Sequence, residues 1–126
     1  MKASFAVASL LAGAVTGAVA VEAIQAQTKP PVYFVFNNEL TNKDGYIKEY
    51  LPKALPTIKA HGGRIIAAGK PTAMSGEPPK ESAGIIVWES MEQLQAWIDS
   101  PEYREARAIG EKYAKYQNFV IPGVPQ

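Results

Sequence analysis

Cysteine is absent from the 126 residues of this chain, and histidine occurs only once, as His61. Without cysteine there can be no disulfide bond, no thiolate nucleophile and no cysteine-ligated metal. A single histidine rules out a histidine-rich metal site within one subunit. These two shortages remove cysteine chemistry and multi-histidine metal centres from the functions to consider, and the sequence gives no reason to expect a cofactor.

An excess of charge of either sign is also lacking. The chain has 13 lysines and arginines against 12 aspartates and glutamates, which gives a net charge of +1 at pH 7. No basic stripe is present, so nucleic acid is not an expected partner. The sequence also lacks a nucleophile elbow, a zinc-protease motif, a phosphate-binding loop and a dinucleotide fingerprint. Any chemistry must therefore be sought in individual side chains.

The first 26 residues have the composition of an export signal. Lys2 precedes 19 uncharged residues, 3–21, of which 12 are Ala, Gly, Ser or Thr. As a helix this stretch would be roughly 28 Å long, close to the ~30 Å hydrocarbon thickness of a bilayer. However, a charged start, a weakly apolar middle and small residues near the end are typical of a signal peptide.

We therefore expect residues 1–26 to form a signal peptide or hydrophobic leader, and the protein to be periplasmic or secreted. Candidate cleavage points follow Ala20, Ala23 and Ala26, of which Ala26 is favoured. The alternative is an anchor to the membrane through residues 3–21. Residues 27–31 then form a linker, because its two prolines prevent a helix from running on. The folded domain is predicted to occupy residues 32–126.

Apolar periodicity in this domain predicts strands and helices in the order βαββαβ. Short apolar runs indicate strands, whereas apolar residues at helical spacing indicate helices. A proline-, glycine- and serine-rich stretch, residues 70–82, is predicted to be a loop. The predicted strands are 32–36, 64–68, 84–89 and 116–121, and the predicted helical regions are 41–61 and 90–114, the second broken near residues 99–100.

Start and stop signals support these helices. Pro52 lacks an amide donor and should kink or restart the first helix near Tyr50. Gly62 and Gly63 should end that helix in the left-handed conformation. Serine and threonine favour helix N-caps. The predicted N-caps are Thr41, Ser90 with Gln93 at capping-box spacing, and Ser100 followed by Pro101.

This order of elements is that of the α+β ferredoxin-like fold, a four-stranded antiparallel sheet with the helices on one face. The strands are nevertheless apolar on both faces. A bare apolar sheet face is at the upper limit of what a monomer exposes. The simplest solution is a homodimer in which the two sheets pack face to face.

Several short motifs resemble the family called domain of unknown function 1330. The resemblance covers residue 31 to about residue 121. The residues that carry it are His61-Gly62-Gly63-Arg64, Trp88-Glu89-Ser90, Ala96-Trp97 and Ser100-Pro101-Glu102-Tyr103.

This resemblance implies the dimeric α/β barrel form of the ferredoxin-like fold, but no particular activity. The wider superfamily includes cofactor-free monooxygenases, haem-degrading enzymes and small-molecule isomerases. Its members imply only a location for a ligand, the cleft between the sheet and the helices. The chain departs from the usual family pattern in the loop before the third strand, where residues 78–81 read PPKE.

Two residues are candidates for chemistry. His61, the catalytic candidate, could act as a general base or ligate haem, since its pKa lies near neutrality; alternatively it interacts with the dipole at the end of the first helix. Arg64 could clamp a carboxylate ligand. Its alternative is a structural ion pair with Glu89 or Glu102.

Five further residues are candidates for lining a ligand pocket. Each has an alternative structural role: packing for the tyrosines, a favourable acid in the first turn of a helix for the glutamate, and the end of the first strand for the asparagine. These candidates are Asn37, Tyr46, Tyr50, Glu102 and Tyr103.

The sequence thus predicts an exported small-molecule-binding protein, with the further possibility of a cofactor-free enzyme acting on an aromatic or carbonyl compound. One alternative is a non-catalytic binding or structural dimer of the cell envelope. Another is haem binding through His61. No nucleic acid partner is expected, and a membrane partner only if the leader is retained.

Overall fold

The fold is built around one long central strand. The computed structural model describes residues 29–126, so the predicted signal peptide lies outside the described residues. Strand β1 pairs along one edge with β3, which in turn pairs with β2, and its other edge pairs with β5 and, at its end, with β4; all pairings are antiparallel. The strands are β1 (Val32–Leu40), β2 (Arg64–Gly69), β3 (Ser82–Trp88), β4 (Ala114–Lys115) and β5 (Asn118–Pro122).

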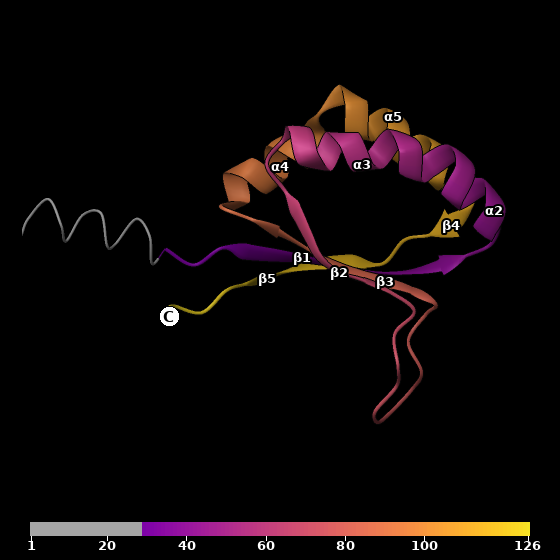
Figure 1. The fold of residues 1–126 in the computed structure, drawn as a ribbon, viewed down its shortest axis with the longest axis horizontal. Helices are drawn as coiled ribbons and strands as arrows, with labels where there is room; N and C mark the ends of the chain where they lie inside the picture. Colours follow the sequence, from indigo (N-terminus) through magenta and orange to yellow (C-terminus); the bar gives the residue numbers. More distant parts are fainter. Residues whose placement is uncertain (1–28) are drawn as a thin grey trace, which may run out of the picture. The chain divides into compact units, whose positions relative to one another are not determined.

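All the described helices lie on one face of this sheet (Figure 1). The helical elements are α2 (Lys43–Gly45), a π-helical turn η1 (Tyr46–Tyr50), α3 (Leu51–Ala60), α4 (Met91–Asp99) and α5 (Pro101–Gly110). Their order along the chain and the strand order confirm the α+β ferredoxin-like arrangement. Within residues 29–126, no helix is both long and apolar enough to cross a membrane.

Local sequence signals explain the helix boundaries around α4 and α5. The Ser90 side chain accepts a hydrogen bond from the Gln93 amide at 3.1 Å, and Ser100 accepts one from the Tyr103 amide at 3.2 Å. Both predicted caps are therefore confirmed. Gly62 ends α3 with a φ of 85°, in the left-handed region that glycine adopts without strain.

The predicted cap of the first helix is wrong by one residue. The N-cap is Asn42 rather than Thr41, because the Asn42 side chain accepts a hydrogen bond from the Gly45 amide at 3.0 Å. Asparagine is at least as good an N-cap as threonine, so the helix can begin one residue later, at Lys43. Strand β1 also runs four residues further than predicted, to Leu40, because its polar end still pairs with β3 and β4.

The break predicted at Pro52 takes the form of the π-turn. The Leu51 amide bonds to the Tyr46 carbonyl, five residues back, instead of four. Pro52 has no amide hydrogen to donate to an α-helical hydrogen bond. The change in hydrogen-bond pattern just before it therefore removes no hydrogen bond from residue 52. The wider turn places Tyr46 and Tyr50 above one another, with ring centroids 4.8 Å apart.

The final predicted strand, residues 116–121, is wrong at its start. Residues 116–117 separate β4 from β5, so the sheet has five strands rather than the predicted four. The Gln117 amide bonds to the Asn38 side chain at 3.2 Å, and its carbonyl accepts from the Asn37 amide at 2.8 Å. At this point the side-chain oxygen of Asn38 accepts the hydrogen bond that a backbone carbonyl would accept in a regular pair of strands, so the pairing is locally disrupted, as in a β-bulge.

The main core lies between the sheet and the helices and is rich in aromatic residues. Trp97 stacks on Trp88 with centroids 4.9 Å apart, meets Phe34 edge-on at 5.3 Å, and contacts Tyr103 at 4.1 Å. Its indole Nε1 donates to Thr57 Oγ1 at 3.0 Å. This single side chain joins β1, β3, α3 and α5.

The opposite face of the sheet, which we call the open face, carries no helix among residues 29–126 (Figure 1). Two cross-strand rows occupy it, as the strand register shows. Phe119 and Ile121 of β5 are 49% and 50% exposed. The β2–β3 loop, residues 70–81, projects from the same side. The rows are Val87, Tyr33 and Ile121, and Ile85, Val35 and Phe119.

Candidate functional site

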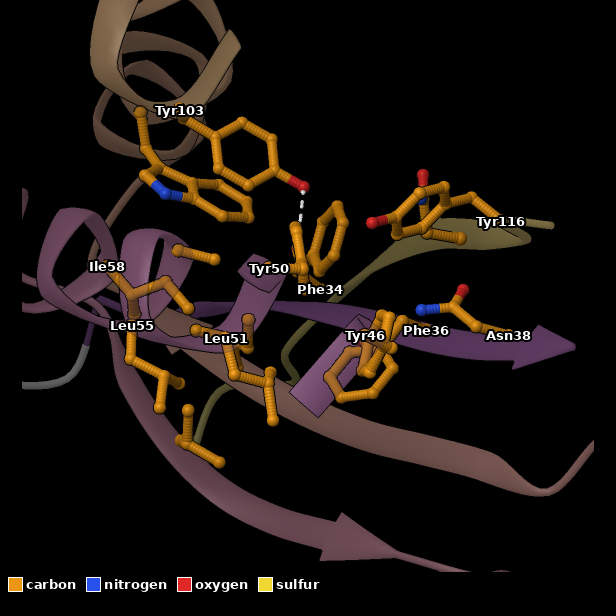
Figure 2. A pocket seen from close by; sticks show the side chains of 15 residues that line it. Phe34, Phe36, Asn38, Tyr46, Tyr50, Leu51, Leu55, Ile58, Tyr103 and Tyr116 are labelled. Atoms are coloured by element: carbon orange, nitrogen blue, oxygen red, sulfur yellow. Dashed lines mark hydrogen bonds between the residues drawn. The ribbon is translucent and has the colours of Figure 1, made fainter. Parts of the chain in front are cut away.

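A cavity lies between the sheet and the helices, beside the aromatic core (Figure 2). It encloses about 50 Å³ that the centre of a water-sized sphere can occupy, more than one water needs. Helices α3 and α5, the π-turn and strands β1, β2, β3 and β5 all contribute to its wall. The lining residues are Phe34, Phe36, Asn38, Tyr46, Tyr50, Leu51, Ala54, Leu55, Ile58, Ile65, Ile86, Trp97, Tyr103, Tyr116 and Asn118.

Four of the polar lining residues owe their positions to identifiable features of the backbone. Alternation along β1 places Asn38 on the same face as Phe34 and Phe36. The π-turn directs Tyr46 and Tyr50 to the same wall. The interruption between β4 and β5 frees Tyr116 from strand pairing.

The four tyrosines form a connected cluster. The Tyr50 and Tyr103 hydroxyl oxygens are 3.4 Å apart, and the rings of Tyr50 and Tyr116 meet edge-on at 5.9 Å. Burial raises the pKa of Tyr50 far above its ordinary value, with the neighbouring tyrosines adding to the effect. Burial likewise raises the pKa of Tyr46, although Asn38 and Ser82 partly oppose it. These hydroxyls are therefore neutral hydrogen-bonding groups at physiological pH.

Tyr116 lies at the edge of this cluster, against Arg107 and Gly110 of α5. Its hydroxyl is buried and, among the described residues, has no partner of normal hydrogen-bond geometry. Burial raises its pKa, and the nearby Tyr50 hydroxyl offsets part of the rise. The guanidinium of Arg107 stacks on the outside of the ring, 3.9 Å from its centroid. Gly110 packs so closely that a methyl group there would overlap the Tyr116 hydroxyl.

The wall of the cavity changes character from one end to the other. Figure 2 shows Leu51, Leu55 and Ile58 on one side and Asn38 and Tyr116 on the other. Leu55 on α3 and Ile65 on β2 are 44% and 43% exposed, so the aliphatic end forms the mouth. Among residues 29–126, no charged side chain lines the cavity.

Three of the predicted ligand-binding residues, Tyr46, Tyr50 and Tyr103, come together in this lining. Asn37 does not: it points to the opposite side, where its side chain exchanges two hydrogen bonds with the Lys80 backbone, at 2.9 and 3.0 Å. This pair ties the base of the β2–β3 loop to β1. Glu102 is an exposed residue of the first turn of α5 and does not line the cavity.

His61 and Arg64 also lie outside the lining. His61 is the C-cap of α3, and its Nδ1 is 2.9 Å from the Thr57 carbonyl oxygen. A haem bound through His61 would therefore sit at the end of this helix and not in the cavity. Arg64 is exposed at the start of β2 and, within residues 29–126, forms no ion pair with Glu89 or Glu102.

Three polar lining residues, Asn38, Tyr116 and Asn118, were not predicted. The alternation of side chains along β1 could have indicated that Asn38 lies on the cavity face, because it is two residues from Phe36 and four from Phe34. The apolar run at residues 116–121 predicts a regular strand, and no sequence signal indicates that the ring of Tyr116 turns inward. No cluster of three or more possible metal ligands occurs among the residues that the structure describes.

The fold matches several solved structures at low sequence identity. A protein of unknown function from Rhodopseudomonas palustris superposes with a TM-score of 0.66 and 16% identity, over 78% of this chain and 85% of that one. SnoaB, a cofactor-independent oxygenase from Streptomyces nogalater, gives 0.58 and 8% identity, over 77% and 96%. A hypothetical Arabidopsis thaliana protein gives 0.52 and 19%, over 79% and 91%. At these identities the likeness shows the fold alone.

No curated protein matches the sequence. A family model, described as Domain of unknown function (DUF1330), matches residues 31–124. The match spans most of the chain and includes the residues at the end of α3 and the start of α5 on which the resemblance depends. The chain therefore belongs to the DUF1330 family.

Proposed function

We propose that this protein binds a small, largely apolar molecule in the cavity between its sheet and its helices. The observation that carries this proposal is the lining: an apolar wall with a few hydroxyl and amide groups and, in the part of the chain that the structure describes, no charged side chain. Such a combination is typical of ligand sites. A tightly packed core without a ligand role would be filled with apolar side chains instead.

Blocking the mouth tests this proposal. Leu55→Trp puts a large ring at the opening, at a position already 44% exposed, so the fold should tolerate it. The matched control is Ile47→Trp, because Ile47 is 45% exposed on the π-turn but does not line the cavity. Binding of the uncharged fluorescent dye Nile red should fall at least tenfold with Leu55→Trp and remain unchanged with Ile47→Trp. Equal binding by both variants and the wild type would contradict the proposal.

A cofactor-free enzyme acting on an aromatic or carbonyl compound is the second candidate. SnoaB, described as a cofactor-independent oxygenase, shares the fold and favours this candidate. The raised pKa values of Tyr46, Tyr50 and Tyr116 oppose general-base catalysis at neutral pH, because these hydroxyls keep their protons. Mass spectrometry of phenols and aromatic ketones incubated with the protein should reveal a product that Leu55→Trp abolishes; no product with any compound would leave binding as the function.

The open face supports a second part of the proposal, that two copies pair through their sheets. Half-exposed Phe119 and Ile121 of β5 lie in cross-strand rows with apolar residues of β1 and β3. Covering this surface would stabilise a pair in proportion to the apolar area buried. Sedimentation equilibrium should give twice the mass of one chain, and a monomer at micromolar concentration would contradict pairing.

Export of the protein remains part of the same proposal. The composition of residues 1–26 supports a cleaved signal peptide, which would place the binding domain in the periplasm or outside the cell. Intact-mass measurement on protein recovered from the periplasmic fraction tests it, with cleavage expected after Ala26. Chains that keep Met1 and stay with the membrane fraction would favour the anchored alternative.

A further inference from the structure

The sheet ends in an exposed strand, β2, on the side where the cavity opens. Within residues 29–126, β2 pairs with β3 along one edge and with no strand along the other. Every residue of β2, Arg64–Gly69, is exposed. In an antiparallel strand with a single neighbour, alternate residues direct their backbone N–H and C=O groups away from that neighbour. The free edge of β2 therefore offers hydrogen-bonding groups to an added strand.

The middle of β2 has few of the features that usually stop another strand from pairing with an edge. Charged side chains and proline are common protective residues. Residues 65–68 read IIAA, with Arg64 before them and Lys70 after the strand. The register shift between Ile65 and Ala67 does bend the strand, which limits the length over which another sheet can follow it. These features favour a short added segment over a second sheet.

The mouth of the cavity opens at this free edge. Ile65 lines the cavity from β2 and Leu55 lines it from α3, and these side chains are 43% and 44% exposed, so both can be reached from outside. Side chains directly opposite each other on adjacent strands lie about 4.5–5.5 Å apart between their Cβ atoms. A strand added beside β2 would therefore place one side chain next to Ile65, directed into the mouth.

The cavity behind the mouth has the size and chemistry of a pocket for an apolar side chain. Its volume of about 50 Å³ holds roughly three to five water-sized spheres, at about 10–15 Å³ for each, which is close to the size of a leucine side chain. Leu51 and Ile58 of α3 supply hydrocarbon beside Leu55 (Figure 2). A charged side chain that entered would lose its hydration, and in the described part of the chain no lining residue offers a counter-ion.

We propose that the free edge of β2 and the cavity together form a binding site for an extended peptide. The peptide would add to β2 as a further strand, and one apolar side chain of about leucine size would enter the cavity between Leu55 and Ile65. In strand addition, main-chain hydrogen bonds give affinity and a side-chain pocket gives specificity. This inference rests on the proposed function, since it uses the same cavity, and it names the class of ligand.

Short peptides with one central apolar residue test the role of the pocket. The probe is acetyl-Glu-Thr-Thr-Leu-Thr-Thr-Glu-amide, and its controls carry alanine or aspartate in place of leucine. Calorimetric titration of the full mature chain at pH 7.5 should give an affinity for the alanine and aspartate peptides at least about tenfold lower than for the leucine peptide. Equal affinity for the leucine and alanine peptides would overturn the inference.

Methylation of the peptide amides tests the added strand. Successive amides of an extended peptide point to opposite edges, so methylating alternate amides blocks one edge at a time. One of the two methylated leucine peptides should bind at least about tenfold more weakly than the parent, and the other should keep its affinity within about threefold. Two methylated peptides that bind alike would overturn strand addition, because a purely hydrophobic contact does not distinguish the two edges.

Hydrogen exchange identifies what occupies the edge. In the free protein, the β2 amides that face the free edge should exchange quickly, and the leucine peptide should slow them by at least about tenfold. Amides that are already protected without peptide, increasingly so at higher protein concentration, would show that a second copy adds its own β2 there, and would overturn the inference.

The outcomes separate this inference from the proposed function. Leu55→Trp should weaken the leucine peptide at least about tenfold, whereas Ile47→Trp should leave it unchanged. Nile red binding that Leu55→Trp abolishes, together with no binding of the leucine peptide, would uphold the cavity as a small-molecule site and refute the peptide site. If neither Nile red nor the leucine peptide binds, both proposals fail.

Discussion

The two faces of the sheet are built from the same strands, but they differ in chemistry. On β1, one set of alternate residues, Phe34, Phe36 and Asn38, faces the helices and the cavity. The other set, which includes Tyr33 and Val35, lies on the open face. The helix side combines aromatic rings with hydroxyl and amide groups, whereas the two rows on the open face are almost entirely hydrocarbon. Equal hydrophobicity along one strand is therefore compatible with two different surfaces, a cavity wall that includes polar groups on one side and a nearly polar-free surface on the other.

The largest expected effect is a loss of stability on removing the central side chain of the helix-covered face, Trp97. Trp97 is 1% exposed and contacts three other aromatic residues, so Trp97→Ala should lower the free energy of unfolding by about 3–5 kcal/mol. Urea denaturation followed by circular dichroism measures the change. Gln95→Ala, an exposed position on the same helix, is the control and should change stability by less than about 0.5 kcal/mol. A small effect of Trp97→Ala would mean that the core is not organised around this ring.

A charge on the open face should instead affect association more than folding. Phe119→Lys places an ammonium group in the proposed sheet-to-sheet contact, where it would have no counter-ion. The dissociation constant of the pair should rise by at least about 100-fold, equivalent to roughly 2.7 kcal/mol. Light scattering across a dilution series measures it. Met74→Lys, at an almost fully exposed position in the β2–β3 loop, provides the control. Equal masses for both variants would remove the open face as the interface.

The smallest expected effect is on the stability of the folded protein at alkaline pH, and it concerns Tyr50 on the helix-covered face. Burial raises the pKa of Tyr50 above its ordinary value of 10.0, so the folded state keeps a proton that the unfolded state releases. The resulting stability is complete below about pH 10 and declines above it, by up to about 1.4 kcal/mol per pH unit for a single tyrosine. Urea midpoints between pH 8 and pH 11.5 should therefore fall less steeply for Tyr50→Phe than for the wild type. Parallel curves would show that Tyr50 ionises equally easily in both states.

The fold could be predicted because its signals are local. Ser90 and Ser100 each cap a helix through the backbone amide three residues further on, which is a contact within one short segment. An apolar run likewise indicates a strand whichever strands it later pairs with. The order of elements then leaves few topologies. One exception was also local: Asn42 competed with Thr41 for one cap, and both are adequate caps.

The candidate site was harder to predict because it depends on which face each residue takes. Since β1 is apolar on both faces, Val35 and Phe36 give no indication of which one meets the helices, and Asn37 and Asn38 were equally plausible. Tyr46 and Tyr50 could be placed together from their spacing of four residues. Tyr116 could not, because its inward position depends on the side chain of Asn38, which lies 78 residues earlier in the sequence and interrupts the last strand.

The β2–β3 loop has a consequence for how any second surface approaches. It projects from the open-face side, and its base is fastened to β1 by Asn37 and by the Glu81 carboxylate, which accepts from the Leu40 amide at 2.7 Å. A flat apolar sheet alone would let a partner slide or rotate, since hydrophobic contact has no direction. Because the loop stands on this side and its base is held by these hydrogen bonds, any surface that covers the open face has to leave room for it, which limits the orientations that such a surface could take.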